Sequence, residues 1–242
     1  MLRGSTAGGP YTQIAELTPR TTVAYTDNPA AGTYYYIVRG FYQNWESVNS
    51  NEASASLTAN TWYLHNNPTP PTGDTVSQLN LPLNQTAPTA STLYNYDTNR
   101  DANAGMLLPK GGTGASESDT NKYQNWQSSA LGSALLINGT VNVRLWSAMK
   151  NFATSTGGTV EVFLRNYNGS TYTEICNGAL TDTTWQDGTS SWVLKTVSFS
   201  CGSYTIPAGN RLEIKIIVSA SSADDMWFAY DTATYDSRLE LP

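Results

Sequence analysis

The segment from Ser191 to Ser219 limits the possible folds of this chain more than any other. Residues 193–199 alternate between two faces with a period of two, as a β-strand with one buried side does. Residues 211–219 repeat the pattern, with three apolar residues on one face and two charged residues on the other. The apolar set is Leu212, Ile214 and Ile216, and the charged set is Glu213 and Lys215. The connection, Pro207-Ala208-Gly209-Asn210, consists largely of turn-forming residues, because Pro fixes φ while Gly and Asn adopt positive φ at little energetic cost. The segment therefore predicts two long antiparallel strands inside a two-sheet β-sandwich.

The composition supports an all-β protein and excludes two classes of partner. Charged residues make up 13% of the chain, about half the usual share, and 19 Gly and 11 Pro supply turns. A net charge of −6 argues against nucleic acid and against an anionic membrane surface, since both require clustered Lys and Arg. We also expect no membrane insertion, because no apolar run approaches the roughly 20 residues that span a bilayer.

The two cysteines, Cys176 and Cys201, are predicted to form a disulfide. A zinc site is the alternative, but a chain with one histidine would have to build it largely from carboxylates. A disulfide points to an oxidising compartment, so we expect an extracellular or cell-surface location. Residues 1–6 do not read as a signal peptide, and we expect the chain to be the C-terminal part of a longer protein.

Residues 60–242 predict eight or nine strands and no helix. Asn168-Gly169 and Asn138-Gly139 each predict a tight hairpin turn between alternating strands. The turn at residues 206–212 and the closing strand at residues 236–242 resemble the jelly-roll β-sandwiches appended to secreted bacterial proteins, carbohydrate-binding modules among them. That resemblance implies a larger antiparallel jelly roll as the second domain.

Residues 1–59 resemble the C-terminal half of a bacterial fibronectin type III domain. The resemblance rests on Gly8-Gly9-Pro10-Tyr11, on the strand Tyr34–Arg39 and on the ending Asn44–Ala53. It implies a partial sandwich that lacks its first strands, with a domain boundary near residue 60. A neighbouring copy could supply the missing strands by strand complementation, or the chain was trimmed from a longer one.

An Asp- and Asn-rich loop is the sharpest candidate for metal binding. Alternating oxygen side chains can surround one Ca²⁺, which takes six to eight oxygen ligands. The loop supplies Asp97, Asn99, Asp101 and Asn103, and Asp224 with Asp225 could add ligands from elsewhere. The alternative is a loop whose Asx side chains cap their own backbone. The possible cofactor is thus a structural Ca²⁺.

Tryptophans and sequons are candidates for glycan contacts. We expect Trp146 and Trp227, which lie in predicted strands, to be core residues, whereas Trp62, Trp185 and Trp192 flank turns. Trp185 and Trp192 are the possible glycan platform. Three sequons, at Asn84, Asn138 and Asn168, are possible glycosylation sites.

No catalytic pattern stands out in the sequence. A Ser-His-Asp arrangement would need His65, the only histidine, and we expect that residue to pack or to stabilise a turn. We therefore predict a non-enzymatic, extracellular structural or adhesive protein that self-associates into an oligomer or filament. The alternative is a carbohydrate-binding module from the tail of a secreted hydrolase, which would bind glycans instead.

Overall fold

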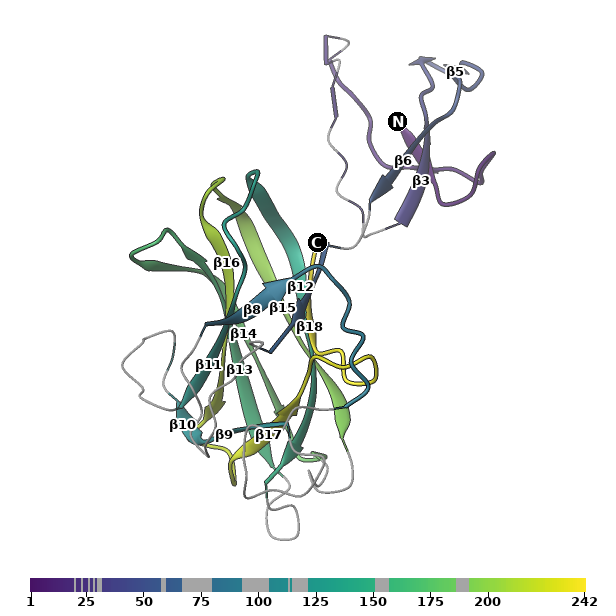
Figure 1. Ribbon diagram of the computed structural model, residues 1–242. Helices are drawn as coiled ribbons and strands as arrows, with labels where there is room; N and C mark the ends of the chain where they lie inside the picture. Colours follow the sequence, from purple (N-terminus) through teal and green to yellow (C-terminus); the bar gives the residue numbers. More distant parts are fainter. Residues whose placement is uncertain are drawn as a thin grey trace. The chain divides into compact units, whose positions relative to one another are not determined.

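The computed structural model describes the chain except for residues 20, 23, 26, 28, 30, 31, 58, 59, 67–79, 93–104, 113, 115–121, 151–156 and 186–191. The chain divides into two compact units, Met1–Ala59 and Asn60–Pro242 (Figure 1). All regular secondary structure of the described residues is β, which confirms the predicted all-β fold. No described segment forms a helix long and apolar enough to cross a bilayer.

The first unit contains a four-stranded antiparallel sheet and a separate hairpin. The sheet has the order β2-β1-β3-β6, with β1 at Leu2–Gly4, β2 at Thr12–Gln13, β3 at Gly32–Ile37 and β6 at Ala53–Leu57. The hairpin pairs β4 (Phe41–Tyr42) with β5 (Trp45–Glu46). Ile37 is the only buried hydrophobic side chain among the described residues of this unit. This arrangement does not show a fibronectin type III fold, which stays a resemblance of the sequence.

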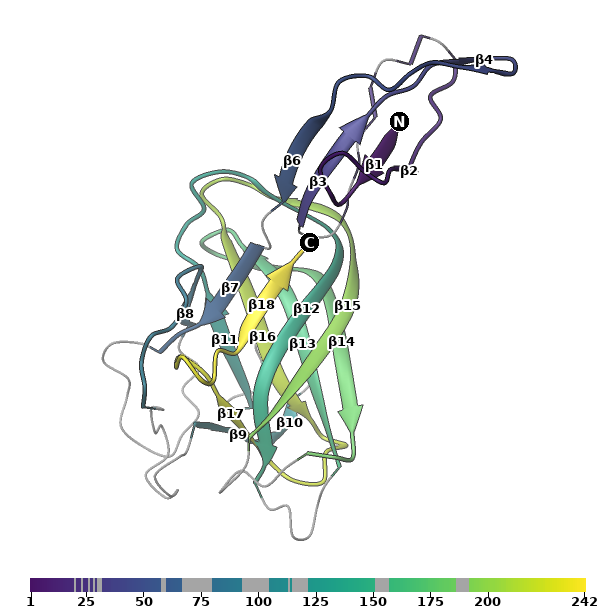
Figure 2. The ribbon, with the colours of Figure 1, turned by 90° about the vertical axis from the view of Figure 1, so that its right-hand side faces the viewer.

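The second unit is one 12-stranded sheet folded into a sandwich of two layers, and the sheet passes from one layer to the other where β7 pairs with β8. Layer 1 contains β8 (Asn80–Asn84), β10 (Lys110–Gly112), β11 (Tyr123–Gln127), β13 (Gly158–Tyr167), β14 (Tyr172–Asp182) and β16 (Arg211–Ser219). Layer 2 contains β7 (Asn60–Leu64), β9 (Met106–Leu108), β12 (Leu135–Met149), β15 (Val193–Ile206), β17 (Met226–Ala229) and β18 (Arg238–Leu241). Figure 2 shows β7, β18, β12 and β15 side by side. Two strand pairs, β8 with β11 and β10 with β16, are parallel and the others are antiparallel.

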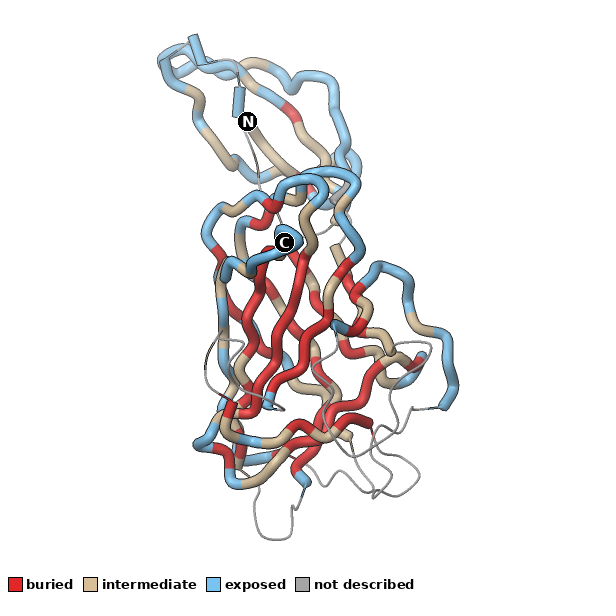
Figure 3. Tube along the Cα trace, turned by 60° about the vertical axis from the view of Figure 1, so that its left-hand side comes forward, coloured by how far each residue is buried: buried red, intermediate tan, exposed pale blue. Residues whose placement is uncertain are grey.

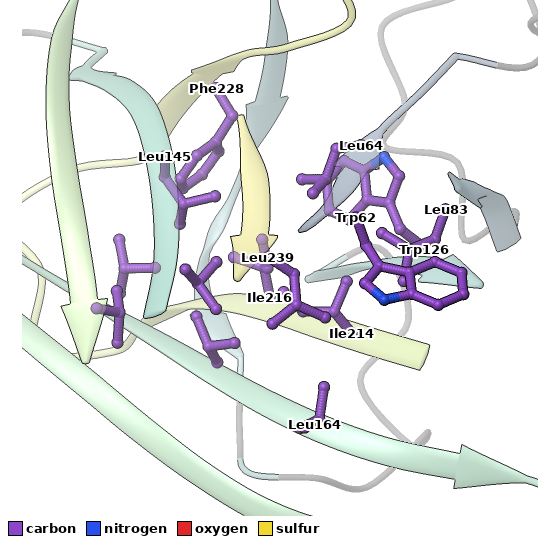
Figure 4. Packing of buried hydrophobic residues seen from close by; sticks show 14 of the residues in the cluster. Trp62, Leu64, Leu83, Trp126, Leu145, Leu164, Ile214, Ile216, Phe228 and Leu239 are labelled. Carbon is purple, nitrogen blue, oxygen red and sulfur yellow. The ribbon is translucent and has the colours of Figure 1, made fainter. Parts of the chain in front are cut away.

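The core lies between the two layers and follows from the alternation of the strands. In β12, Val141, Val143 and Leu145 are buried and belong to the same apolar cluster. Ile214 and Ile216 of β16 and Trp126 of β11 join the same cluster from layer 1 (Figure 4). Buried residues run along the strands of this unit (Figure 3). Burial of this apolar surface is the main favourable term in folding.

The strands β15 and β16 do not pair with each other, so the antiparallel pair predicted from residues 191–219 is wrong. β15 pairs with β12 in layer 2, whereas β16 pairs with β13 and β11 in layer 1. The connection at residues 207–210 therefore crosses from one layer to the other. Leu131 holds it there, because its carbonyl accepts from Gly209 N (2.8 Å) and its N–H donates to Asn210 O (2.8 Å). Alternation shows which side chains share a face of a strand but does not distinguish a hairpin from a crossing between sheets.

The two Asn-Gly dipeptides have different outcomes. Asn168-Gly169 forms the predicted turn between β13 and β14, with Gly169 at φ 98°. Asn138-Gly139 is not a hairpin, because β12 continues through it and the register with β15 shifts at this point. Gly139 has φ 134°, which its lack of a side chain permits. The dipeptide therefore forms a bulge that bends a 15-residue strand rather than reversing it.

Candidate functional site

The predicted disulfide between Cys176 and Cys201 is present, with Cα atoms 5.4 Å apart. It joins β14 of layer 1 to β15 of layer 2, two strands that share no hydrogen-bond ladder. These strands approach closely at Gly178, where a Cβ would lie 2.4 Å from Cδ1 of Phe199. The disulfide thus closes one edge of the sandwich, and it is compatible with an oxidising compartment.

The predicted calcium ligands fall into two groups. Asp97, Asn99, Asp101 and Asn103 lie outside the described residues. Asp224 and Asp225 lie just before β17, where Asp225 accepts from Lys110 N and from Lys150 Nζ, both at 3.0 Å. The described residues contain no group of three or more His, Cys, Asp or Glu side chains that could hold a metal ion. Calcium binding remains a prediction.

The predicted sequon asparagines Asn84, Asn138 and Asn168 are all exposed. Asn84 Oδ1 accepts from Thr86 N at 2.8 Å. Asn168 Oδ1 accepts from the N–H groups of Ser170 (3.0 Å) and Thr171 (2.9 Å) at the hairpin turn. Their glycosylation remains a prediction.

The tryptophans correct part of the predicted glycan platform. Trp185 is 3% exposed and its Nε1 donates to Gly158 O at 3.1 Å, so it is a core residue and not a surface platform. Trp62 is also buried, because the alternation of β7 turns it inward. Trp227 is buried as expected. Trp146, expected in the core, is only partly buried, and so is Trp192.

Three aromatic side chains, Trp146, Trp192 and Tyr235, gather on the outer side of layer 2, and we name them the aromatic face. Trp146 alternates in β12 with the core residue Leu145 and therefore points away from the core. The ring centroid of Tyr235 lies 5.4 Å from that of Trp146 at an interplanar angle of 73°. It lies 5.9 Å from that of Trp192 at 52°. All three residues are partly exposed, so the aromatic face offers ring surface to a ligand.

A small apolar cluster supports the aromatic face. Trp192 and Leu107 pack against Ala148 and Trp227, which are both buried. This cluster is separate from the main core, on the opposite side of layer 2. Packing of this kind restricts the rotamers of Trp192, so the aromatic face exists before any ligand arrives.

A row of charged side chains beside the aromatic face forms what we name the polar strip: Arg144, Asp236, Arg238 and Glu240. Glu240 Oε1 lies 2.9 Å from Nε of Arg144 and 2.9 Å from Nε of Arg238. Arg238 also pairs with Asp236, with 2.6 Å between its guanidinium and Oδ2. Trp146 Nε1 donates to Asp236 Oδ1 at 3.4 Å, which connects the strip to the aromatic face. Two arginines and two carboxylates make the strip neutral while leaving it rich in donors and acceptors.

A second cluster of charges lies on the outer side of layer 1. Glu213 and Lys215 are 0% exposed and Arg165 is 1% exposed, although the sequence places them opposite the core-facing residues of their strands. Arg165 and Glu213 form an ion pair, and Lys215 Nζ lies 4.3 Å from the ring centroid of Tyr123. Buried charges are tolerated in proteins when they are paired. Because this cluster is closed to solvent, we regard it as structural.

His65 joins two segments of the second unit. Its Nδ1 lies 2.6 Å from Oδ1 of Asp231, and its Nε2 lies 3.0 Å from the carbonyl oxygen of Thr86. The other oxygen of Asp231 accepts from Asn66 N at 2.8 Å. Both ring nitrogens therefore contact oxygen acceptors, and no hydroxyl group of the described residues is bonded to either of them. This geometry fits the structural role expected for His65.

The sequence contains a signal for the aromatic face that the prediction missed. Asn142, Arg144 and Trp146 follow each other at every second position of β12, so Trp146 has the phase of the polar residues. Tyr235 had no such signal, because it lies in the connection between β17 and β18.

Solved structures with the same fold include chains of hydrolases. One is a CocE/NonD family hydrolase from Staphylococcus aureus, 12% identical, with a TM-score of 0.52 over 79% of this chain and 39% of the hydrolase chain. Another is an alpha-amino acid ester hydrolase, 11% identical, with a TM-score of 0.51 over 77% of this chain and 36% of that one. A structure of carbohydrate-binding modules from the β-sandwich superfamily is 10% identical over 84% of this chain and 85% of that one, and its TM-score of 0.26 is too low to support an argument. No family model matches the sequence, and no curated protein matches it.

These matches overturn one prediction. The prediction of a non-enzymatic protein is contradicted, because solved structures that match this fold with TM-scores of 0.50 to 0.52 are chains of hydrolases. The chain spans only 36% to 41% of their length, and at identities of 11% to 12% the likeness concerns the fold alone. The matches also give no support to a filament subunit, and self-association remains a prediction.

Proposed function

We propose that residues 60–242 form a glycan-binding β-sandwich that belongs to a secreted hydrolase. The observation that carries this proposal is the partly exposed aromatic face with the neutral polar strip beside it. The alternative predicted from the sequence, a carbohydrate-binding module, has the same function. That prediction assigned binding to Trp185 and Trp192, whereas the aromatic face consists of Trp146, Trp192 and Tyr235.

The chemistry of the two surfaces fits a sugar chain. A pyranose ring has an apolar face of C–H groups that can pack on an aromatic ring, and Trp and Tyr supply large, rigid apolar area. Sugar hydroxyls donate and accept hydrogen bonds, and the arginines and carboxylates of the polar strip offer both partners. Ligand sites commonly combine an apolar surface with a few polar groups that fix orientation. The neutrality of the strip favours an uncharged glycan.

Two further observations support the hydrolase context. The fold is that of a part of longer hydrolase chains, and the disulfide suits an oxidising compartment outside the cytoplasm. In this proposal the sandwich holds the polymer on which the longer protein acts. The identity of the bond that is hydrolysed belongs to the remainder of that protein.

The test is affinity electrophoresis of the full chain in gels that contain a xylan, a glucomannan or a mixed-linkage glucan. We expect at least one of these polymers to retard the protein, and Trp192→Ala to weaken binding tenfold or more, about 1.4 kcal/mol. Leu136→Ala is the matched control, because Leu136 is an apolar residue of β12 that is 57% exposed. Retardation that is unchanged in Trp192→Ala and in Tyr235→Ala would contradict the proposal.

A further inference from the structure

Exposed apolar side chains concentrate in the first unit. Among the described residues, every exposed large hydrophobic residue except Leu136 lies within residues 1–59. Isolated exposed apolar residues are common on protein surfaces, whereas a group of them commonly marks a binding surface. All of these residues except Tyr25 lie on or beside the β4–β5 hairpin. The residues at the hairpin are Val38, Phe41, Tyr42, Trp45 and Val48.

The hairpin places two of the aromatic rings next to each other. Tyr42 and Trp45 are direct partners in the antiparallel register, and so are Phe41 and Glu46. Direct partners share a face of the ribbon, with Cβ atoms about 5 Å apart. Tyr42 and Trp45 therefore lie side by side on one face, each 65% exposed, while Phe41 lies on the other. We name Tyr42 and Trp45 the hairpin pair.

Local hydrogen bonds fix the base of the hairpin. Ser47 N donates to Gly40 O at 2.9 Å, and Gly40 N donates to Ser47 Oγ at 3.0 Å. Arg39 joins both sides of the base, because its Nε donates to Asn49 Oδ1 at 2.5 Å and its NH1 donates to Glu46 Oε1 at 3.1 Å. The hairpin pair is thus held by a short, closed ribbon. A fixed ribbon lowers the entropy lost when a ligand binds.

We propose that the hairpin pair is a stacking platform for the sugar rings of a neutral polysaccharide. Two neighbouring aromatic rings of high exposure can each cover the apolar face of one sugar unit. The tip residues Gln43 and Asn44 supply amide donors and acceptors for the hydroxyls. The charges at the base of the hairpin, Arg39 and Glu46, are paired with each other, so this surface does not select an anionic ligand.

The polar tip argues against the other partners that an aromatic hairpin could have. Entry into a lipid bilayer would have to begin with Gln43 and Asn44, whose amides lose their hydration in hydrocarbon. Gln43 also has φ 53°, the left-handed backbone conformation of a tight two-residue turn, so the two amides lie at the very end of the ribbon. The rings of the hairpin pair are therefore suited to a ligand that approaches their face and not the tip.

This platform is independent of the aromatic face, because it lies on the other unit. A chain with two weak sites for one polymer gains avidity, since the second binding event becomes intramolecular. For a glycan long enough to reach both sites at once, the affinity of the full chain exceeds that for a short oligosaccharide by more than the number of sites. The two sites can be separated by substitution.

The experiment measures the affinity of the full chain for the same three polysaccharides, with phosphatidylcholine vesicles as a second probe. Tyr42→Ala with Trp45→Ala should weaken polysaccharide binding tenfold or more, both in the natural chain and in a Trp192→Ala background. Phe41→Ala is the control, because Phe41 is 50% exposed on the opposite face of the same ribbon. We expect less than a twofold effect from it. Since all three residues are at least half exposed, the thermal unfolding of the variants should match that of the natural chain, which checks folding.

Several results would overturn the inference. Unchanged polysaccharide affinity in the Tyr42→Ala/Trp45→Ala variant would do so, and so would an equal loss in Phe41→Ala. Vesicle binding that depends on Trp45 would indicate a membrane surface instead. Loss of all binding in Trp192→Ala alone would refute the hairpin pair as a binding site while supporting the aromatic face. The absence of binding to every polysaccharide would refute both proposed sites.

Discussion

Reduction of the Cys176–Cys201 disulfide should destabilise the second unit by a calculable amount. The two cysteines are 25 residues apart, and closing a loop of that length lowers the entropy of the unfolded chain by an amount worth about 3.5 kcal/mol. In a domain of this size each kcal/mol shifts Tm by about 2–4 °C, so Tm should fall by about 7–14 °C.

The assay is urea and thermal unfolding of the natural chain, oxidised and reduced, followed by near-ultraviolet circular dichroism. The double variant Cys176→Ala/Cys201→Ala is the second arm, and it should lose slightly more, since Cys201 is 3% exposed and its sulfur contributes to the core. A loss below about 1 kcal/mol on reduction would refute this reasoning. It would mean that the cross-link restricts the unfolded chain less than its loop length predicts.

Three further predictions concern single side chains of the second unit. Glu213→Gln should cost about 3–5 kcal/mol in urea unfolding, because it leaves the buried Arg165 without its carboxylate, whereas Arg165→Met/Glu213→Leu should recover most of the loss. The hydrogen bond from Lys195 holds the pKa of Asp182 well below its usual range. Its carboxylate therefore stabilises the fold above the unfolded pKa near 4, and this stability is lost as the pH falls through the folded pKa. Asp182→Asn should thus lower the free energy of unfolding by less than about 1 kcal/mol at neutral pH, and by a smaller amount in acid. A loss of stability that grows as the pH falls would contradict this pH dependence. Gly178→Ala should cost about 1–3 kcal/mol, because the new Cβ would overlap a ring of β15, and an unchanged Tm would contradict it.

The sequence predicted the strands better than their partners. Alternation and the Asn168-Gly169 turn located β13, β14, β15 and β16, because side-chain period and turn chemistry are local properties. Local patterns carry no information about which strand lies across a ladder. The connection at residues 207–210 therefore read as a hairpin although it crosses between layers, and Asn138-Gly139 read as a turn although it is a bulge.

The candidate site was predicted only in part, for a related reason. Trp192 belongs to the aromatic face as a surface residue, but Trp185 is buried because its indole reaches Gly158, a contact that no spacing reveals. Glu213 and Lys215 have the phase of an outward face and are nevertheless buried. Alternation identifies the two sides of a strand, and whether the outer side meets solvent depends on the rest of the fold. Tyr235 and Asp236 join the site through a connection whose path the sequence does not determine.

The most direct test of glycan binding by the aromatic face is nuclear magnetic resonance of the tryptophan indole groups during titration with an oligosaccharide of the polymer that binds best. The chain has seven tryptophans, and each gives one indole signal. We predict that the signals of Trp146 and Trp192 shift in a saturable way, whereas those of the core residues Trp126 and Trp185 do not move. A shift of Trp45 would report the hairpin pair separately. Saturable binding that leaves both Trp146 and Trp192 unchanged would contradict the account.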